Sequence, residues 1–130
     1  MEVAYKPEGY STVSPYLVVS GAARTIEFLI ETFDGVELRR FDREDGSILH
    51  AEVQIEDSVV MLADPPEGTE PAATSVHVYV RDVMTTYAKG LKAGGLPIQT
   101  PVQKDDPDKR GAIRDSGGTT WWIATQVGTE

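Results

Sequence analysis

Two residues of the types that transfer protons near neutral pH stand close together in the middle of the chain. His50 and Glu52 are two positions apart in residues 49–55, where apolar and polar residues alternate. Positions i and i+2 of a β-strand point to the same face, so the two side chains would be neighbours. A histidine beside a carboxylate can act as a general base or hold a ligand. The alternative is a polar cross-strand pair at the edge of a cleft, without a chemical role.

A second histidine and three aromatic residues follow the same alternation elsewhere. His77 and Tyr79 alternate with valines in residues 75–80, so they would share one strand face. Tyr16 and Trp122 lie in two further apolar runs. Aromatic faces attract planar and cationic groups, so Tyr16, Tyr79 and Trp122 could stack on a ligand. The alternative is simple hydrophobic filling of a narrow cleft.

Two groups of residues raise the question of a metal site. His50, Glu52 and His77 would supply imidazole and carboxylate ligands to an atypical transition-metal site, provided that the fold brings them together. Three aspartates in residues 105–108 suggest calcium, but the segment lacks the glycine turn and closing glutamate of an EF-hand loop. We therefore expect a solvated loop there.

Composition excludes several other classes of chemistry. The chain has no cysteine, which rules out a thiol nucleophile, an iron–sulfur cluster and a thiolate zinc site. Its formal charge of −9 repels phosphate backbones and anionic lipid surfaces, so we expect neither nucleic acid nor membrane as a partner. The sequence has no signal-peptide pattern and no apolar run that could cross a bilayer, and we expect a cytoplasmic location.

Glycine, proline and hydrophobic periodicity divide the chain into short elements. One helix is predicted over residues 20–33, with Ser20 as its N-cap, and a second from Asp82 to the Gly94-Gly95 pair. Strands are predicted at residues 15–19, 36–41, 49–55, 58–63, 75–80, 97–102 and 121–124. In residues 49–55 the odd-numbered positions would face the core.

The order of strand, helix and three strands occurs twice. It predicts an α+β fold, one domain over residues 1–130, made of two tandem βαβββ modules at about 10–66 and 73–127. A shift of 61 places sets Met61 on Trp122 and Ala51 on Ala112. The helices would cover the outer face of a curved mixed sheet. The uncovered faces would meet each other, or a partner, around a cleft.

Four segments carry a family resemblance: Tyr10-Ser-Thr-Val-Ser-Pro-Tyr-Leu-Val-Val, Ile26-Glu-Phe, His50-Ala-Glu-Val-Gln-Ile-Glu-Asp-Ser-Val-Val-Met-Leu-Ala-Asp, and Gly111-Ala-Ile-Arg-Asp-Ser-Gly-Gly with Trp121-Trp-Ile-Ala-Thr. In these the chain resembles the vicinal oxygen chelate superfamily of glyoxalases, bleomycin-resistance proteins and extradiol dioxygenases. Within that superfamily it resembles the PhnB-like branch. The likeness runs from Gly9 to Gln126, and residues 50–64 are its most specific part.

The resemblance also implies where a metal and a ligand would lie. Metal-using members place one metal ligand near the start of the first strand of each module and one on its last strand, which corresponds here to Ser14, Met61, Ser75 and Trp122. None of these is a histidine or a carboxylate, so we expect no metal and no other cofactor. The implied cavity would be lined by Ser14, Tyr16, His50, Glu52, Met61, Ser75, His77, Tyr79 and Trp122.

Three classes of function follow from this pattern. The first is a metal-free binding protein of the bleomycin-resistance kind, which would sequester a small cationic or planar molecule. The second is an enzyme: a metal-dependent lyase, isomerase or dioxygenase with an atypical ligand set, or a metal-free acid–base catalyst that uses His50 and Glu52. The third is a dimer-forming module with a vestigial pocket. The resemblance implies a homodimer, and the sequence leaves open which face Arg114 occupies.

Overall fold

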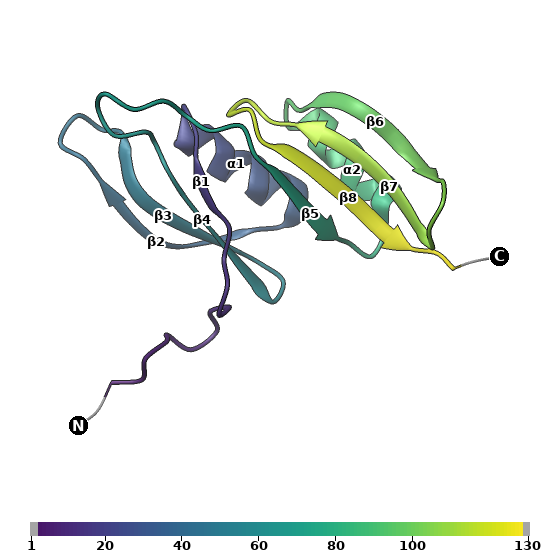
Figure 1. The fold of residues 1–130 in the computed structure, drawn as a ribbon, viewed down its shortest axis with the longest axis horizontal. Coiled ribbons are helices and arrows are strands. Elements are labelled where there is room, and N and C mark those ends of the chain that lie inside the picture. The colour runs from purple at the N-terminus through teal and green to yellow at the C-terminus, as the bar shows by residue number, and fades with distance from the viewer. Residues whose placement is uncertain (1–2, 129–130) are drawn as a thin grey trace.

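The repeat of two βαβββ modules is confirmed by a computed structural model, which describes residues 3–128 (Figure 1). The first module consists of strand β1 (Tyr16–Val18), helix α1 (Ala22–Phe33) and strands β2 (Val36–Asp42), β3 (Ile48–Ile55) and β4 (Ser58–Ala63). The second consists of strand β5 (Ser75–Tyr79), helix α2 (Val83–Lys92) and strands β6 (Leu96–Gln103), β7 (Asp108–Arg114) and β8 (Thr120–Gln126). No helix in this part of the chain is long and apolar enough to cross a membrane.

Each module forms a mixed four-stranded sheet, which confirms the predicted α+β class. The strand orders are β1-β4-β3-β2 and β5-β8-β7-β6, with the first pair in each parallel and the others antiparallel. Tyr16 pairs with Met61 as His77 pairs with Trp122, so the 61-residue offset holds for these strands. Between β3 and β7 the offset is 60. Ala51 pairs with Leu62, the residue 61 places after Leu62 is Ile123, and Ile123 pairs with Gly111. The equivalence of Ala51 with Ala112 was therefore wrong by one place.

The two helices begin in different ways. Asp82 caps α2 as predicted, since its carboxylate accepts hydrogen bonds from the backbone N–H groups of Met84 and Thr85. The prediction that Ser20 caps α1 is wrong. Gly21 holds that place in the left-handed conformation, and the carboxylate of Asp64, from the end of β4, accepts from the N–H groups of Gly21 and Ala22 instead.

A single core joins the modules through their helices. Helices α1 and α2 pack against each other, and the centre of the Phe33 ring in α1 lies 5.6 Å from that of the Trp121 ring in β8. Ala51, Val53 and Ile55 face this core as predicted. Leu49 does not, because a bulge between Phe41 and Asp42 shifts the pairing and leaves Ile48 buried in its place. The opposite face of each sheet, turned away from the helices, is called its open face below.

Candidate functional site

Four of the expected site residues lie on the open face of the first sheet. Tyr16, His50, Glu52 and Met61 each alternate along their strands with residues of the core, and Met61 pairs with both Tyr16 and Glu52. The fifth residue of this module, Ser14, precedes β1, and its hydroxyl lies 3.2 Å from that of Ser11. The alternation in the sequence therefore places His50 and Glu52 of β3 on one surface with Tyr16 of β1.

Glu52 is the centre of this surface. The residue is only 2% exposed, although its side chain faces away from the helices. One carboxylate oxygen accepts a hydrogen bond from the hydroxyl of Tyr10, and the other lies 2.8 Å from Nε2 of His50. Burial raises the pKa of Glu52, but the hydrogen bonds from Tyr10 and His50 outweigh burial, so the pKa lies below its ordinary value. The carboxylate is thus charged at neutral pH.

Aromatic rings surround His50. Its Nδ1 lies 3.4 Å from the hydroxyl of Tyr16, and the ring of Phe41 on β2 stacks at 6.5 Å between centroids. If Nε2 carries the proton that Glu52 accepts, Nδ1 presents a lone pair to Tyr16 and to the open face. The arrangement can therefore accept a proton, or a hydrogen bond, from a bound molecule.

Sequence reasoning missed three residues of this group. Tyr10 comes from the segment before β1, Arg39 lies with its guanidinium carbon 5.4 Å from the centre of the Tyr10 ring, and Phe41 stacks on His50. Phe41 could have been found, since it is an aromatic residue in a predicted strand. Tyr10 lies outside every predicted strand, so periodicity carries no signal for it.

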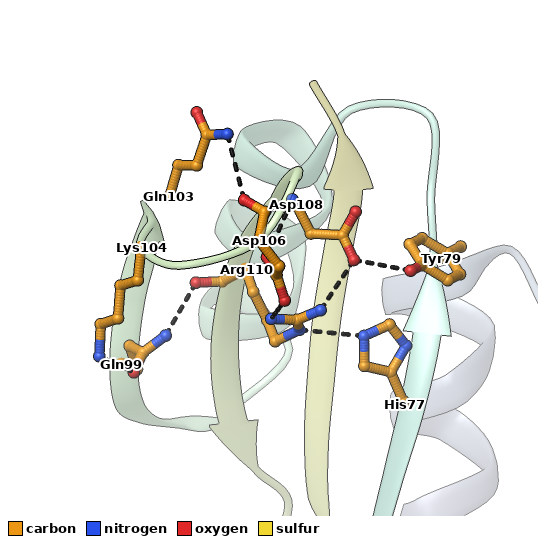
Figure 2. A network of polar contacts seen from close by, with 8 residues as sticks. All are labelled: His77, Tyr79, Gln99, Gln103, Lys104, Asp106, Asp108 and Arg110. Atoms are coloured by element: carbon orange, nitrogen blue, oxygen red, sulfur yellow. Dashed lines mark hydrogen bonds and ion pairs between the residues drawn. The ribbon is translucent and has the colours of Figure 1, made fainter. Parts of the chain in front are cut away.

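The second module carries a different network on its open face (Figure 2). Arg110 on β7 donates from Nε to Nε2 of His77 at 3.0 Å, and from its terminal nitrogens to Asp106 at 3.1 Å and Asp108 at 2.8 Å. The hydroxyl of Tyr79 also donates to Asp108, at 2.6 Å. Burial, and then the charge of Arg110, lower the pKa of His77, which keeps its Nε2 free to accept.

This network corrects the expectation for residues 105–108. Asp108 is the first residue of β7 and is only 6% exposed, rather than part of a solvated loop. Its neighbours Asp105 and Asp106 are exposed, as expected. Arg114 alternates with the core residue Ile113, so it lies on the open face of the second sheet.

The nine expected residues therefore form two groups, one on each sheet. The hollow beside Tyr79 is lined by both helices, by the β3–β4 turn and by residues 80–82, and the hollow beside Ser75 by Arg114 and Thr120. Neither hollow reaches Trp122 or His50.

By the pairing of β7 with β8, Ala112 holds the position of Glu52, and so the second module has no equivalent carboxylate.

The side chains give little support to a metal within one chain. His50 and Glu52 are in contact, but His77 belongs to the other sheet and contacts Arg110, so the atypical three-residue site does not form in one chain. Among residues 3–128, no group of three histidine or acidic side chains could hold an ion. The absence of a cofactor stays a prediction.

Known proteins share both the sequence pattern and the fold. Residues 11–123 match the model of the Glyoxalase/Bleomycin resistance protein/Dioxygenase superfamily. An uncharacterized protein of Mycobacterium bovis is 30% identical over 126 residues, which cover 88% of this chain and 83% of that one. The antibiotic binding protein TnmS3 from Streptomyces sp. CB03234 has the same fold, with a TM-score of 0.68, 16% identity, and coverage of 96% of this chain and 99% of that one. A PhnB protein from Bacillus cereus also has it, with a TM-score of 0.68, 19% identity, and coverage of 88% and 99%. The chain belongs to the Glyoxalase/Bleomycin resistance protein/Dioxygenase superfamily.

Proposed function

We propose that this protein binds a planar small molecule on its open sheet faces and sequesters it without changing it chemically. The observation that carries the proposal is the set of aromatic side chains turned away from the core. Tyr16 is 51% exposed, Phe41 55% and Tyr79 61%, and the half-buried Trp122 lies beside His77. A sheet face of this kind offers stacking surfaces with a few polar groups between them, as small-molecule sites do. The family membership and the antibiotic-binding TnmS3 support the same function.

The ligand would be neutral or cationic. The chain carries a formal charge of −9, and the one arginine in the second network is already paired with Asp106 and Asp108. Glu52 adds a buried negative charge to the first open face. The net charge of the chain would therefore disfavour an anion.

The complete site would form between two copies of the chain. Each open face is one wall only, and the open face of the first sheet in one copy can pack opposite that of the second sheet in another. Size-exclusion chromatography with light scattering tests this step, and a dimer of about twice 14.2 kDa is expected. A monomer at the concentrations where ligand binds would contradict it.

Tryptophan provides the test of binding. Trp122 lies on the open face, whereas Trp121 is fully buried in the core. Calorimetric titration with proflavine, a planar cation, should show binding that Trp122→Ala weakens about tenfold, and anthraquinone-2-sulfonate, a planar anion, should bind less tightly. Trp122→Phe, which keeps an aromatic ring, is the matched control and should retain most of the affinity. A dimer that binds neither compound, nor any of a panel of neutral planar compounds, would refute the proposal.

A second candidate function is metal-free acid–base catalysis. The contact between Nε2 of His50 and the buried Glu52 favours it, because a carboxylate that orients a histidine is a common device for a general base. Incubation with small ketones in D₂O would reveal proton abstraction as deuterium uptake by NMR, which His50→Gln should abolish. Elemental analysis of the purified protein tests the metal-dependent alternative.

A further inference from the structure

We infer that the position beside Glu52 receives an aromatic hydroxyl group of the ligand, and that Tyr10 occupies this position in the free protein. The inference rests on the proposed function, and it adds the chemical group that the first open face recognises. The side chain of Tyr10 is itself a phenol, and it takes the place of the ligand's aromatic hydroxyl group.

The hydrogen bonds of Glu52 show which of its oxygens the sheet leaves without a partner. The oxygen facing His50 is satisfied within β3, by a residue two positions away. Among residues 3–128, the other oxygen receives only the hydroxyl of Tyr10, which comes from outside the sheet and from 42 residues earlier in the sequence. A buried carboxylate oxygen needs a donor, so any molecule that displaces Tyr10 has to supply one.

The surroundings of Tyr10 favour a neutral aromatic ring over a cation. The guanidinium of Arg39 lies 5.4 Å from the centre of the Tyr10 ring, where it attracts the face of an aromatic ring and repels a positive charge. The hydrogen bond to Glu52 raises the pKa of Tyr10, so the phenol stays protonated and keeps its donor. An ammonium ion could satisfy Glu52, but it would be repelled by Arg39. An aliphatic alcohol would leave the ring position unfilled.

The segment that carries Tyr10 lies outside both sheets. It precedes β1, contains Gly9 with a positive φ of 86°, and Tyr10 itself donates its backbone N–H to Pro7 at 3.2 Å. Ser11 anchors the segment, because its hydroxyl accepts from the backbone N–H of Val59 at 3.1 Å. With Ser11 fixed on β4, Tyr10 can leave Glu52 without disturbing any strand pair, so a ligand can replace it.

The test replaces the side chain of Tyr10 by a free molecule. In Tyr10→Ala the site beside Glu52 is vacated, and p-cresol, which is the tyrosine side chain as a separate compound, should bind there. Toluene has the same ring and methyl group without the hydroxyl. We expect p-cresol to bind Tyr10→Ala at least about tenfold more tightly than toluene in NMR titrations, with shifts at Glu52 and His50. The unaltered chain should show no such preference.

Equal affinity for p-cresol and toluene in Tyr10→Ala, or shifts remote from Glu52, would overturn the inference. If Tyr10→Ala does not fold, Tyr10→Phe keeps the ring and removes only the donor. There 2-naphthol should bind about tenfold more tightly than naphthalene, and equal binding would again contradict the inference. These comparisons report on the Glu52 position alone, whereas an unaltered dimer that binds no planar compound would contradict the proposed function instead.

Discussion

At the scale of single residues, Glu52 shows how a carboxylate can remain charged under a nearly complete cover of protein. Burial by itself favours the neutral acid, by withdrawing the charge from water. Hydrogen bonds to the charged form act in the opposite direction, and Glu52 receives one at each oxygen, from Tyr10 and from His50. Their combined effect is the larger, so folding stabilises the ionised form and stability becomes dependent on pH.

Replacing Glu52 with glutamine should reveal this dependence. Because the pKa of Glu52 is lower in the folded chain than in the unfolded chain, the unfolded chain takes up the proton first as the pH falls. The stabilisation due to the charge is complete above the ordinary glutamate pKa of about 4.3 and is lost as the pH falls through the lower, folded value. Urea denaturation of the unaltered chain and of Glu52→Gln should therefore give a difference in unfolding free energy that shrinks from about pH 6 to pH 3. A difference that is constant or grows on acidification would show that the folded pKa is not lowered.

Individual residues of the site differ in how far the sequence predicts them. Period-two alternation was sufficient to put His50 and Glu52 on one face of β3, because that rule depends only on strand geometry. It could not identify Tyr10, because the contact of this residue with Glu52 depends on where the segment before β1 lies in the fold. It could not identify Arg110 either, because β7 has no apolar alternation to mark it as a strand. The identity of a carboxylate's partner is a tertiary property, so pattern alone does not predict it.

At the scale of elements, the repeated order of strands and helices predicted the fold best, and the residue types at helix ends predicted it least well. The limits of β7 could not be read from the sequence, because Asp108-Lys-Arg-Gly carries no apolar alternation. Ser20 has the residue type of an N-cap, but the carboxylate of Asp64 reaches the first turn of α1 from a strand 42 residues later. A cap supplied by a distant strand leaves no local trace in the sequence.

Asp64 should therefore matter more than an ordinary cap. Its two oxygens accept from the N–H groups of Gly21 and Ala22 at 2.9 Å and of Ile48 at 2.7 Å, which ties α1 to both β3 and β4. Asp64→Ala should lower the free energy of unfolding by about 2 kcal/mol, as measured by urea denaturation followed by circular dichroism. Asp82→Ala, which removes the local cap of α2, is the matched control and should cost less. Equal losses would contradict the bridging role of Asp64.

Close packing of α2 on the second sheet depends on a glycine after the helix. A Cβ atom on Gly95 would lie 2.3 Å from Cγ2 of Ile113 and 2.9 Å from the carbonyl oxygen of Gly90. Gly95→Ala should therefore destabilise the fold by about 2–3 kcal/mol, because neither the β-branched methyl group nor the backbone can move away easily. Gly94→Ala tests backbone strain alone, since nothing lies within 4 Å and φ is 102°. Gly94→Ala should lower the free energy of unfolding by about 1 kcal/mol. A loss larger than that of Gly95→Ala would contradict the packing argument.

At the scale of the whole molecule, the modules differ in chemistry although they share a plan. Glu52 on β3 is replaced by Ala112 on β7, and the place of His50 is taken by Arg110. One open face therefore carries the buried Glu52, and the other carries an arginine paired with two aspartates, of which Asp108 is also buried. Under the proposed function, the two walls share one plan, and their different side chains would recognise different parts of one ligand.

The two modules should nevertheless unfold together, because residues of both contribute to one core. Both tryptophans lie in β8 of the second module, and Trp121 also packs against Phe33 of α1, whereas circular dichroism follows both modules. Leu62 is fully buried in the first module, and Leu62→Ala should cost about 3 kcal/mol. If the core is shared, this change shifts the tryptophan-detected urea midpoint as much as the midpoint seen by circular dichroism. Val36→Ala, at an exposed position of the same module, should move neither midpoint appreciably. A tryptophan transition that stays in place while circular dichroism shifts would mean that the modules fold independently, since the helix-mediated core would then transmit no stability between them.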